Sequence, residues 1–158
     1  ARLGPDGLLL DRHEDAEGRP RAHTEITIEG CYTLAYPLAV ACLRDGLPAW
    51  RELAWKQVSA RCDHLVHGGV VAQRAALGGP ISQADWARAC GWFLLGVART
   101  ADVLRDPPPL IAATFAQVAQ RALGLQRDDG LWSVYLSEPA TGSDTSGSAA
   151  IAAGLALG

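Results

Sequence analysis

The sequence predicts an all-α fold, in which most of the chain is helical and the helices are joined by loops of very unequal length. Two observations lead to this prediction. Apolar residues recur at three- and four-residue steps through most of the chain, which is the spacing of amphipathic helices. Clusters of proline and glycine interrupt that spacing, and such clusters end helices or form turns. The pattern is typical of antiparallel helix pairs, so we expect the long loops to gather at one end of the molecule.

The opening of the chain predicts a short extended segment followed by a helix. Residues 4–20 alternate turn signals with the apolar run Leu8–Leu10, which favours a short strand or hairpin. Helical spacing begins at Ile26 and ends at Asp45-Gly46. Pro37 lies inside this segment and predicts either a first turn before it or a kink.

The middle of the chain predicts two longer helices. The first runs from Ala49 to about Leu65, with Pro48 in its first turn. Residues 66–80 are rich in glycine and are expected to form a loop. The second helix is expected to begin at Ser82, whose hydroxyl can accept hydrogen bonds from free backbone amides, and to end at about Leu104.

The end of the chain predicts two further helices. One runs from about Leu110 to Leu123 and is closed by Gly124 in the left-handed position that follows many helices. Residues 126–142 are irregular, with a short strand over Trp132–Leu136. The last helix runs from about Asp144 to Gly158, and its many small residues predict close packing between neighbouring helices. No sheet of four or more strands is expected.

Composition excludes several classes of protein. The chain has 158 residues, enough for one domain, and its 49% apolar and 20% charged residues exclude a mainly disordered state. A net charge of −3 lacks the basic surface that nucleic-acid binding requires. No run of roughly 18 apolar residues predicts a membrane span, and no signal-peptide pattern opens the chain, so we expect a cytoplasmic protein. Methionine is absent, which favours a segment of a longer protein.

The cysteines and histidines predict neither a disulfide framework nor a metal site. The four cysteines form no CxxC pair. Cys62, His64 and His67 lie close in sequence, but no fourth ligand stands at the spacing of a zinc site. We therefore expect no metal and no cofactor.

Three segments together resemble the signatures of one enzyme family. Residues 86–92 (WARACGW) resemble its WARGNGW signature, residues 126–132 (QRDDGLW) resemble its Q-x-x-DGLW loop, and residues 144–149 (DTSGSA) resemble its ETSGSA or ETSGTA helix start. Their order and spacing agree along the chain. The sequence thus resembles the unsaturated glucuronyl and rhamnogalacturonyl hydrolases, glycoside hydrolase families 88 and 105.

The resemblance implies part of an (α/α)6 barrel, a ring of helical hairpins with short strands in the loops. The chain, residues 1–158, would supply the middle to late helices of that domain, without its N-terminal helices. An incomplete ring leaves apolar faces uncovered, so we expect an exposed apolar patch or a partner chain that covers it.

The resemblance also implies an unusual hydrolase. Its substrate is an oligosaccharide, released by a polysaccharide lyase, that ends in a 4,5-unsaturated uronic acid. One carboxyl group protonates C4 and helps water to add at C5, and the hemiketal formed then opens and releases the neighbouring sugar. This chemistry needs an acid/base group, a cation for the uronate carboxylate and aromatic walls for the ring.

Two residues are the candidates for catalysis. Residues 28–32 resemble the family's W-x-D-x-L-[FY]-M segment, with Glu29 in place of the acid/base aspartate. The alternative is a carboxylate favoured near a helix N-terminus. His67 lies in a segment that resembles the family's L-[FY]-x-H-G loop, which implies a contact to the substrate or to the acid/base. The alternative is an ordinary loop histidine near a helix end.

Four residues are the candidates for substrate binding. Arg88 is the candidate for the uronate carboxylate, because a guanidinium matches a carboxylate with two parallel hydrogen bonds. Trp86, Trp92 and Trp132 are candidates for contact with sugar rings. The alternatives are a surface arginine and tryptophans of the hydrophobic core.

Two other functions remain open at this point. A non-catalytic member of the same fold would bind carbohydrate or serve as a scaffold, and a half barrel could be completed by another chain or a second copy. Glu29 buried beside His67 and Arg88 would favour catalysis, whereas an exposed Glu29 would favour binding alone.

Overall fold

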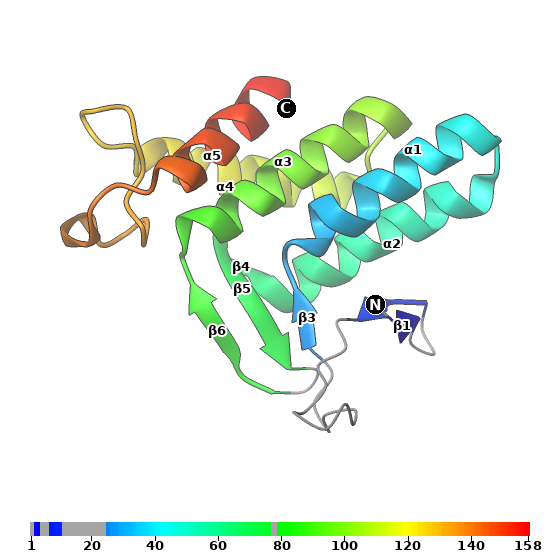
Figure 1. The fold of residues 1–158 in the computed structure, drawn as a ribbon, viewed down its shortest axis with the longest axis horizontal. Helices are drawn as coiled ribbons and strands as arrows, with labels where there is room; N and C mark the ends of the chain where they lie inside the picture. The colour runs from blue at the N-terminus through cyan, green and yellow to red at the C-terminus, as the bar shows by residue number, and fades with distance from the viewer. Residues whose placement is uncertain (1, 4–6, 11–24, 77–78) are drawn as a thin grey trace.

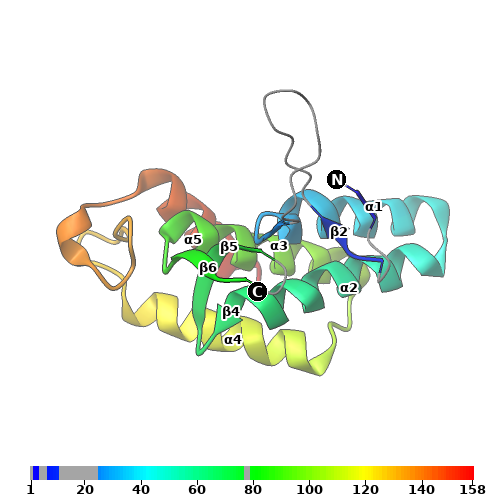
Figure 2. The same ribbon diagram turned by 90° about the horizontal axis from the view of Figure 1, so that it is seen from below.

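Five α-helices in two layers make up most of the structure (Figure 1). The computed structural model describes residues 2–3, 7–10, 25–76 and 79–158. One layer holds three helices side by side and the second layer holds the other two (Figure 2). The first layer consists of α1 (Tyr36–Asp45), α3 (Ala87–Leu104) and α5 (Thr145–Leu157), and the second of α2 (Pro48–Leu65) and α4 (Pro109–Gly124). The predicted helical fold with short strands is confirmed.

A small antiparallel sheet joins three strands that lie between α2 and α3 in the sequence with one strand that precedes α1. It contains four strands with β5 at the centre, namely β3 (Glu25–Thr27), β4 (Val66–His67), β5 (Val70–Ala76) and β6 (Ile81–Ala84). The expectation of a plain loop over 66–80, and of no four-stranded sheet, is wrong. Gly68 and Gly69, with φ of 59° and 79°, form the tight turn of a β-hairpin rather than an open loop. Residues 77–78 lie outside the described ranges.

The start of the chain forms a second, two-stranded sheet. β1 (Arg2–Leu3) pairs antiparallel with β2 (Leu9–Leu10), so a short strand lies at Leu9–Leu10, as expected of residues 4–20. Residues 4–6 and 11–24 are outside the described ranges, so the rest of that expectation is not tested.

The first helix begins later than predicted. Ile26 belongs to strand β3 and pairs with Ala75. A π-helical turn, η1 (Cys31–Ala35), precedes α1, and Pro37 occupies the second position of α1. Ala35 and Tyr36 both keep helical backbone angles, so η1 runs directly into α1, and Pro37, which has no N–H to donate, lies inside one continuous helical segment. The first turn predicted before Pro37 is present as this π-helical turn.

Two predicted helix caps differ from the structure. Ser82 lies in β6 and caps nothing; α3 instead begins after the extended residue Trp86, with no side-chain cap. Gly124 is the last residue of α4 rather than a left-handed residue beyond it. The ends of α1 and α2 agree with the prediction, and Gly46 closes α1 at φ 66°.

The segment between α4 and α5 contains isolated bridges where a strand was expected. Tyr135 bridges to Trp86 and Ser133 to Ser143, and a 3-10 turn, η2 (Pro139–Thr141), follows. The strand predicted over Trp132–Leu136 is therefore absent.

Glycines bring α5 into close contact with α3. A Cβ atom added at Gly154 would lie 2.6 Å from the Cβ of Leu94, and one added at Gly91 would lie 2.6 Å from the Cβ of Ala150. The predicted close packing of this helix is thus confirmed on its α3 side.

Two buried polar side chains of α2 hold the N-terminal strands. Gln57 and Arg61 are fully buried. Gln57 accepts from the backbone N–H of Leu9 (2.8 Å) and donates to the carbonyl of Gly7 (2.8 Å). Arg61 donates to the carbonyls of Thr27 (2.8 Å) and Leu9 (3.1 Å). We call this pair the backbone clamp.

The helix ends that flank residues 66–80 and 126–142 lie together, although the first of these segments is a β-hairpin rather than a loop. α2 ends, α3 begins, α4 ends and α5 begins at one end of the helical layers (Figure 1). Large apolar side chains are exposed on α1, at Val40 and Leu43, and just before α2, at Leu47, as expected of an incomplete ring. None of the helices in the described ranges is long and apolar enough to cross a membrane.

Candidate functional site

The loop end of the molecule brings Trp86 and Arg88 together at the start of α3. The Cζ atom of Arg88 lies 4.1 Å from the centroid of the Trp86 ring, so the guanidinium is placed over the aromatic face. The Arg88 Nε donates to the Oδ2 of Asp144 (3.2 Å). The Arg88 side chain is still 49% exposed. Its terminal nitrogens have no hydrogen-bond partner among the described residues, which leaves them available to an anionic ligand.

Asp144 is fixed in place by the helix that it caps. Its Oδ1 accepts from the backbone N–H of Gly147 (2.9 Å) and from the Ser146 hydroxyl (2.7 Å). Burial of Asp144 acts to raise its pKa, but the hydrogen bonds from Gly147 and Ser146 and the charge of Arg88 outweigh burial and hold the pKa below its usual value. Asp144 is therefore a firmly ionised partner of Arg88.

An aromatic row continues from Arg88 along the same face of α3. Trp92 is four residues after Arg88, one helical turn further. Its ring lies 5.7 Å from the Tyr32 ring, and the Tyr32 ring stacks at 5.6 Å on Tyr36. Arg99 ends the row, with its Cζ 6.0 Å from the Tyr36 centroid. All three rings are partly exposed, so a sugar can contact them. Tyr32 and Tyr36 were not predicted as part of this row.

Glu29 lies at the entrance to the π-helical turn that carries Tyr32. Its carbonyl oxygen accepts from the backbone N–H groups of Tyr32 (2.9 Å) and Thr33 (2.8 Å). Its side chain is half-buried and contacts neither His67 nor Arg88 by a hydrogen bond or ion pair. π-helical turns are frequent at functional sites because the extra residue changes where side chains point. Here Glu29 lies three residues before Tyr32, the first aromatic residue that the turn carries.

His67 is exposed in strand β4, at the loop end of the molecule. It pairs with Val70 across the tight turn of the hairpin. In the described part of the chain, no hydrogen bond or ion pair joins it to Glu29 or Arg88. The single cluster of Glu29, His67 and Arg88 that would favour catalysis is therefore not formed.

Trp132 is part of the core, which corrects its assignment to substrate binding. The residue is only 3% exposed, and its indole Nε1 donates to the Ala122 carbonyl of α4 (2.7 Å). Its backbone N–H donates to the Ser148 hydroxyl (2.8 Å). A buried Trp commonly finds a partner for its N–H in this way, and the ring fixes the loop after α4 to α4 and α5.

Asp85 organises the loop end and was missed by the sequence analysis. Both of its carboxylate oxygens accept from the Arg121 Nη2 at 2.9 Å, and Oδ2 also accepts from the Ser137 backbone N–H (3.0 Å). Asp85 adopts a left-handed conformation with φ 66°. The available signal was an aspartate directly before the Trp86 motif, at a turn into a helix. Aspartate tolerates the left-handed conformation of such turns better than most residues.

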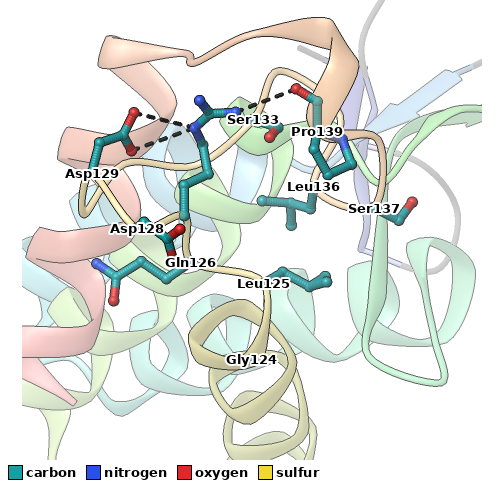
Figure 3. Close-up of a pocket in the computed structure, with 10 residues that line it drawn as sticks. Gly124, Leu125, Gln126, Asp128, Asp129, Ser133, Leu136, Ser137 and Pro139 are labelled. Atoms are coloured by element: carbon teal, nitrogen blue, oxygen red, sulfur yellow. Dashed lines mark hydrogen bonds and ion pairs between the residues drawn. The ribbon is translucent and has the colours of Figure 1, made fainter.

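A pocket of about 540 Å³ opens beside this end, in the loop after α4 (Figure 3). Arg127 lines it and pairs with Asp129, with Nε–Oδ2 at 3.3 Å, and its Nη1 donates to the Pro139 carbonyl (3.3 Å). Because Arg127 is already engaged by its own loop, Arg88 is the better candidate for an external carboxylate. Within the described ranges, no three His, Cys, Asp or Glu side chains converge as metal ligands would.

Comparisons with known proteins identify the family and the fold. The family model Glycosyl Hydrolase Family 88 matches residues 64–158. The crystal structure of a possible member of the GH105 family from Salmonella enterica subsp. enterica serovar Paratyphi A is similar at a TM-score of 0.78 and 18% identity, covering 91% of this chain and 42% of that one. No curated protein matches the sequence.

Two further structures are similar over a slightly shorter stretch. One is an unsaturated glucuronyl hydrolase from Bacillus sp. GL1, described as responsible for the degradation of glycosaminoglycan, with a TM-score of 0.69, 21% identity and coverage of 82% of this chain and 38% of that one. The other is a UGL variant with dGlcA-Glc-Rha-Glc, with the same TM-score of 0.69, 21% identity and 82% and 38% coverage.

The chain matches only part of each of these solved structures. It spans only 38% to 42% of the length of these solved structures, so it corresponds to part of their (α/α)6 barrel. The matched residues 64–158 contain His67, Trp86, Arg88 and Trp92, whereas Glu29 lies before them. The chain belongs to glycosyl hydrolase family 88, of which it forms a partial, mostly helical barrel domain.

Proposed function

We propose that the protein hydrolyses unsaturated uronides, by hydrating the 4,5-double bond of the unsaturated uronic acid at the non-reducing end of lyase-derived oligosaccharides. The observation that supports this most directly is the guanidinium of Arg88, placed 4.1 Å over the Trp86 ring with its terminal nitrogens available. A flat cation above an aromatic wall suits a planar carboxylate that is attached to a flat sugar ring.

The aromatic row supports the same substrate class. Trp92 and Tyr32, 5.7 Å apart, continue from Arg88 and provide apolar faces for the adjoining sugar. A UGL variant of similar fold is known with dGlcA-Glc-Rha-Glc, an oligosaccharide of this kind. His67, exposed at the loop end, is assigned a polar contact with the substrate.

In the proposed mechanism, Glu29 is the acid/base. Its carboxyl group donates a proton to C4 while water adds its oxygen to C5, and the carboxylate then takes a proton from that water. Hydrogen and hydroxyl are thus added across the double bond, and Glu29 regains its starting state. The hemiketal at C5 opens the ring, and the hemiacetal left at C1 releases the neighbouring sugar.

The test is loss of the ultraviolet absorbance of the conjugated double bond when the protein meets an unsaturated disaccharide. Glu29→Gln should abolish turnover but retain substrate binding, because an amide cannot donate the proton. Glu52→Gln, on the exposed face of α2, is the matched control and should keep the parent rate. Turnover at the parent rate by Glu29→Gln would remove Glu29 from the mechanism.

Arg88→Ala tests the binding part of the proposal separately. It should weaken binding of an unsaturated uronide and spare a neutral sugar, because the lost contact is a charge pair. Arg44→Ala is the control, because Arg44 lies in the last turn of α1 and its side chain is 77% exposed. Equal losses for both ligands would mean that Arg88 acts through folding alone.

One observation favours a second function, carbohydrate binding without turnover. In the described part of the chain, Glu29 has no hydrogen bond or ion pair with His67 or Arg88. A protein that binds unsaturated uronides through Arg88 and leaves their absorbance unchanged would have this function instead.

A further inference from the structure

Arg88 is a long side chain whose position is set by two neighbours. Its guanidinium faces the Trp86 ring on one side, and its Nε donates to Asp144 at 3.2 Å. A half-exposed arginine without such contacts samples many rotamers and loses them on binding a ligand. The two contacts hold the terminal nitrogens in one direction before any ligand arrives.

Asp144 can set this direction because its two oxygens have different tasks. Oδ1 accepts from the Gly147 backbone and the Ser146 hydroxyl, and Oδ2 accepts from Arg88. The first two bonds fix the carboxylate to the start of α5. The capping task does not require a charge, because Ser and Asn cap helices about as well as Asp.

The backbone around this pair is also closely fitted. A Cβ atom added at Gly147 would lie 2.7 Å from the Cβ of Ala87 and 3.1 Å from the backbone nitrogen of Arg88. The first turn of α5 is therefore held directly against the first turn of α3. Since both helix ends are fixed relative to each other, the position of Oδ2 determines where the Arg88 side chain lies.

We propose that Asp144 is a positioning residue that orients Arg88, so that the terminal nitrogens of the guanidinium meet the carboxylate of an unsaturated uronide. The ligand takes the free side of the guanidinium, and the Nε contact to Asp144 is kept. This inference rests on the proposed function for its ligand, but the orientation of Arg88 is a property of the protein alone.

Removal of Asp144 has two opposite effects on binding. Loss of orientation weakens binding, because the free arginine must be ordered by the ligand. Loss of a negative charge near the ligand strengthens binding, because a repulsion disappears. Salt separates these effects: at 0.5 M salt the Debye length falls to about 4 Å, so repulsion between the two carboxylates is largely screened while the orientation of Arg88 is not.

The first experiment uses no carbohydrate. The rate at which phenylglyoxal modifies Arg88 is measured by peptide mass spectrometry in the parent, Asp144→Ser, Asp144→Asn and Ser146→Ala. Arg88 should react fastest in Asp144→Ser, more slowly in Asp144→Asn, which keeps a neutral acceptor, and at the parent rate in Ser146→Ala, which perturbs only the cap. Equal rates in all four proteins would overturn the proposal.

The second experiment measures binding of an unsaturated disaccharide and of a neutral disaccharide at 0.5 M salt. In Asp144→Ser, affinity for the unsaturated disaccharide should fall by up to about 10- to 30-fold, the range that corresponds to ordering one arginine side chain. Affinity for the neutral disaccharide, and the urea midpoint of unfolding, should change far less. Unchanged or tighter binding at both low and high salt would show that Asp144 only caps α5.

The two proposals fail in different ways. If the parent protein binds no unsaturated uronide, the proposed function fails together with the ligand named here, while the modification rates still decide whether Asp144 orients Arg88. If the parent binds and the Asp144 variants bind equally, the proposed function stands and the positioning role is overturned.

Discussion

Gly96 marks the closest approach between α3 and the π-helical turn η1, and its replacement by alanine should loosen that contact. The residue is buried within α3. A Cβ atom there would lie 2.5 Å from the carbonyl carbon of Cys31 and 2.6 Å from the backbone nitrogen of Tyr32. These atoms belong to the main chain of a hydrogen-bonded turn, so they cannot move aside as the end of a side chain would.

The size of the effect follows from two opposing contributions. Non-bonded carbon atoms rest about 3.5 Å apart or more, so the new Cβ is about 1 Å too close. Overpacking of this kind costs about 1–3 kcal/mol, while alanine gains about 1 kcal/mol over glycine inside a helix. Because the obstacles are main-chain atoms, we expect the upper part of that range, and a net loss of about 1–2 kcal/mol in the free energy of unfolding.

Urea unfolding followed by tryptophan fluorescence measures this loss, and Trp92 beside Tyr32 reports on the contact itself. Gly124→Ala is the matched control, because Gly124 also lies in a helix but its added Cβ meets nothing within 4 Å. The control should be neutral or slightly stabilising. If Gly96→Ala proved as stable as Gly124→Ala, the close contact would not constrain the turn.

Three further predictions concern the loop end. Trp132→Phe should lower the free energy of unfolding, measured by urea denaturation, by about 1–3 kcal/mol through loss of the hydrogen bond to the Ala122 carbonyl and of ring volume. Binding of neutral sugars, measured by calorimetry, should be unchanged. Asp85→Asn should tolerate the left-handed backbone but weaken the contact to Arg121, with a loss of about 1–3 kcal/mol by urea unfolding; an unchanged midpoint would show that the pair is not stabilising. The pKa of Asp144 is lowered in the folded protein, so its contribution to stability is present above the ordinary carboxyl pKa of about 3.9 and is lost as the pH falls through the folded value. The melting temperature of the parent should therefore fall more steeply in acid than that of Asp144→Asn.

The helices could be predicted from the sequence because their signals are local. Pro48 at the first position of α2 and Gly46 after α1 agree with the structure, since both residues act through their own backbone geometry. The strands could not be predicted in the same way. β5 buries the polar Gln73 among small apolar residues, so it shows no simple alternation, and Ser82 was interpreted as a helix cap although it belongs to β6.

The candidate site was only partly predictable for a related reason. The contact of Arg88 with Trp86 joins residues that are two apart in the sequence, and both were predicted as binding residues. The partner of Arg88 is Asp144, which lies 56 residues further along, and such pairing depends on how α5 packs on α3. Trp132 shows the reverse error, because a motif indicates that a tryptophan is needed without indicating whether its ring faces solvent or core.

The backbone clamp of α2 has a consequence for how freely this protein can vary. The bonds described for Gln57 and Arg61 to Gly7, Leu9 and Thr27 end on peptide N–H and C=O groups, which every non-proline residue carries. Side chains on β2 and β3 can therefore change while these attachments persist. The two positions on α2 have no such freedom, so random substitutions selected for folding should accumulate on the strands and be rare at Gln57 and Arg61.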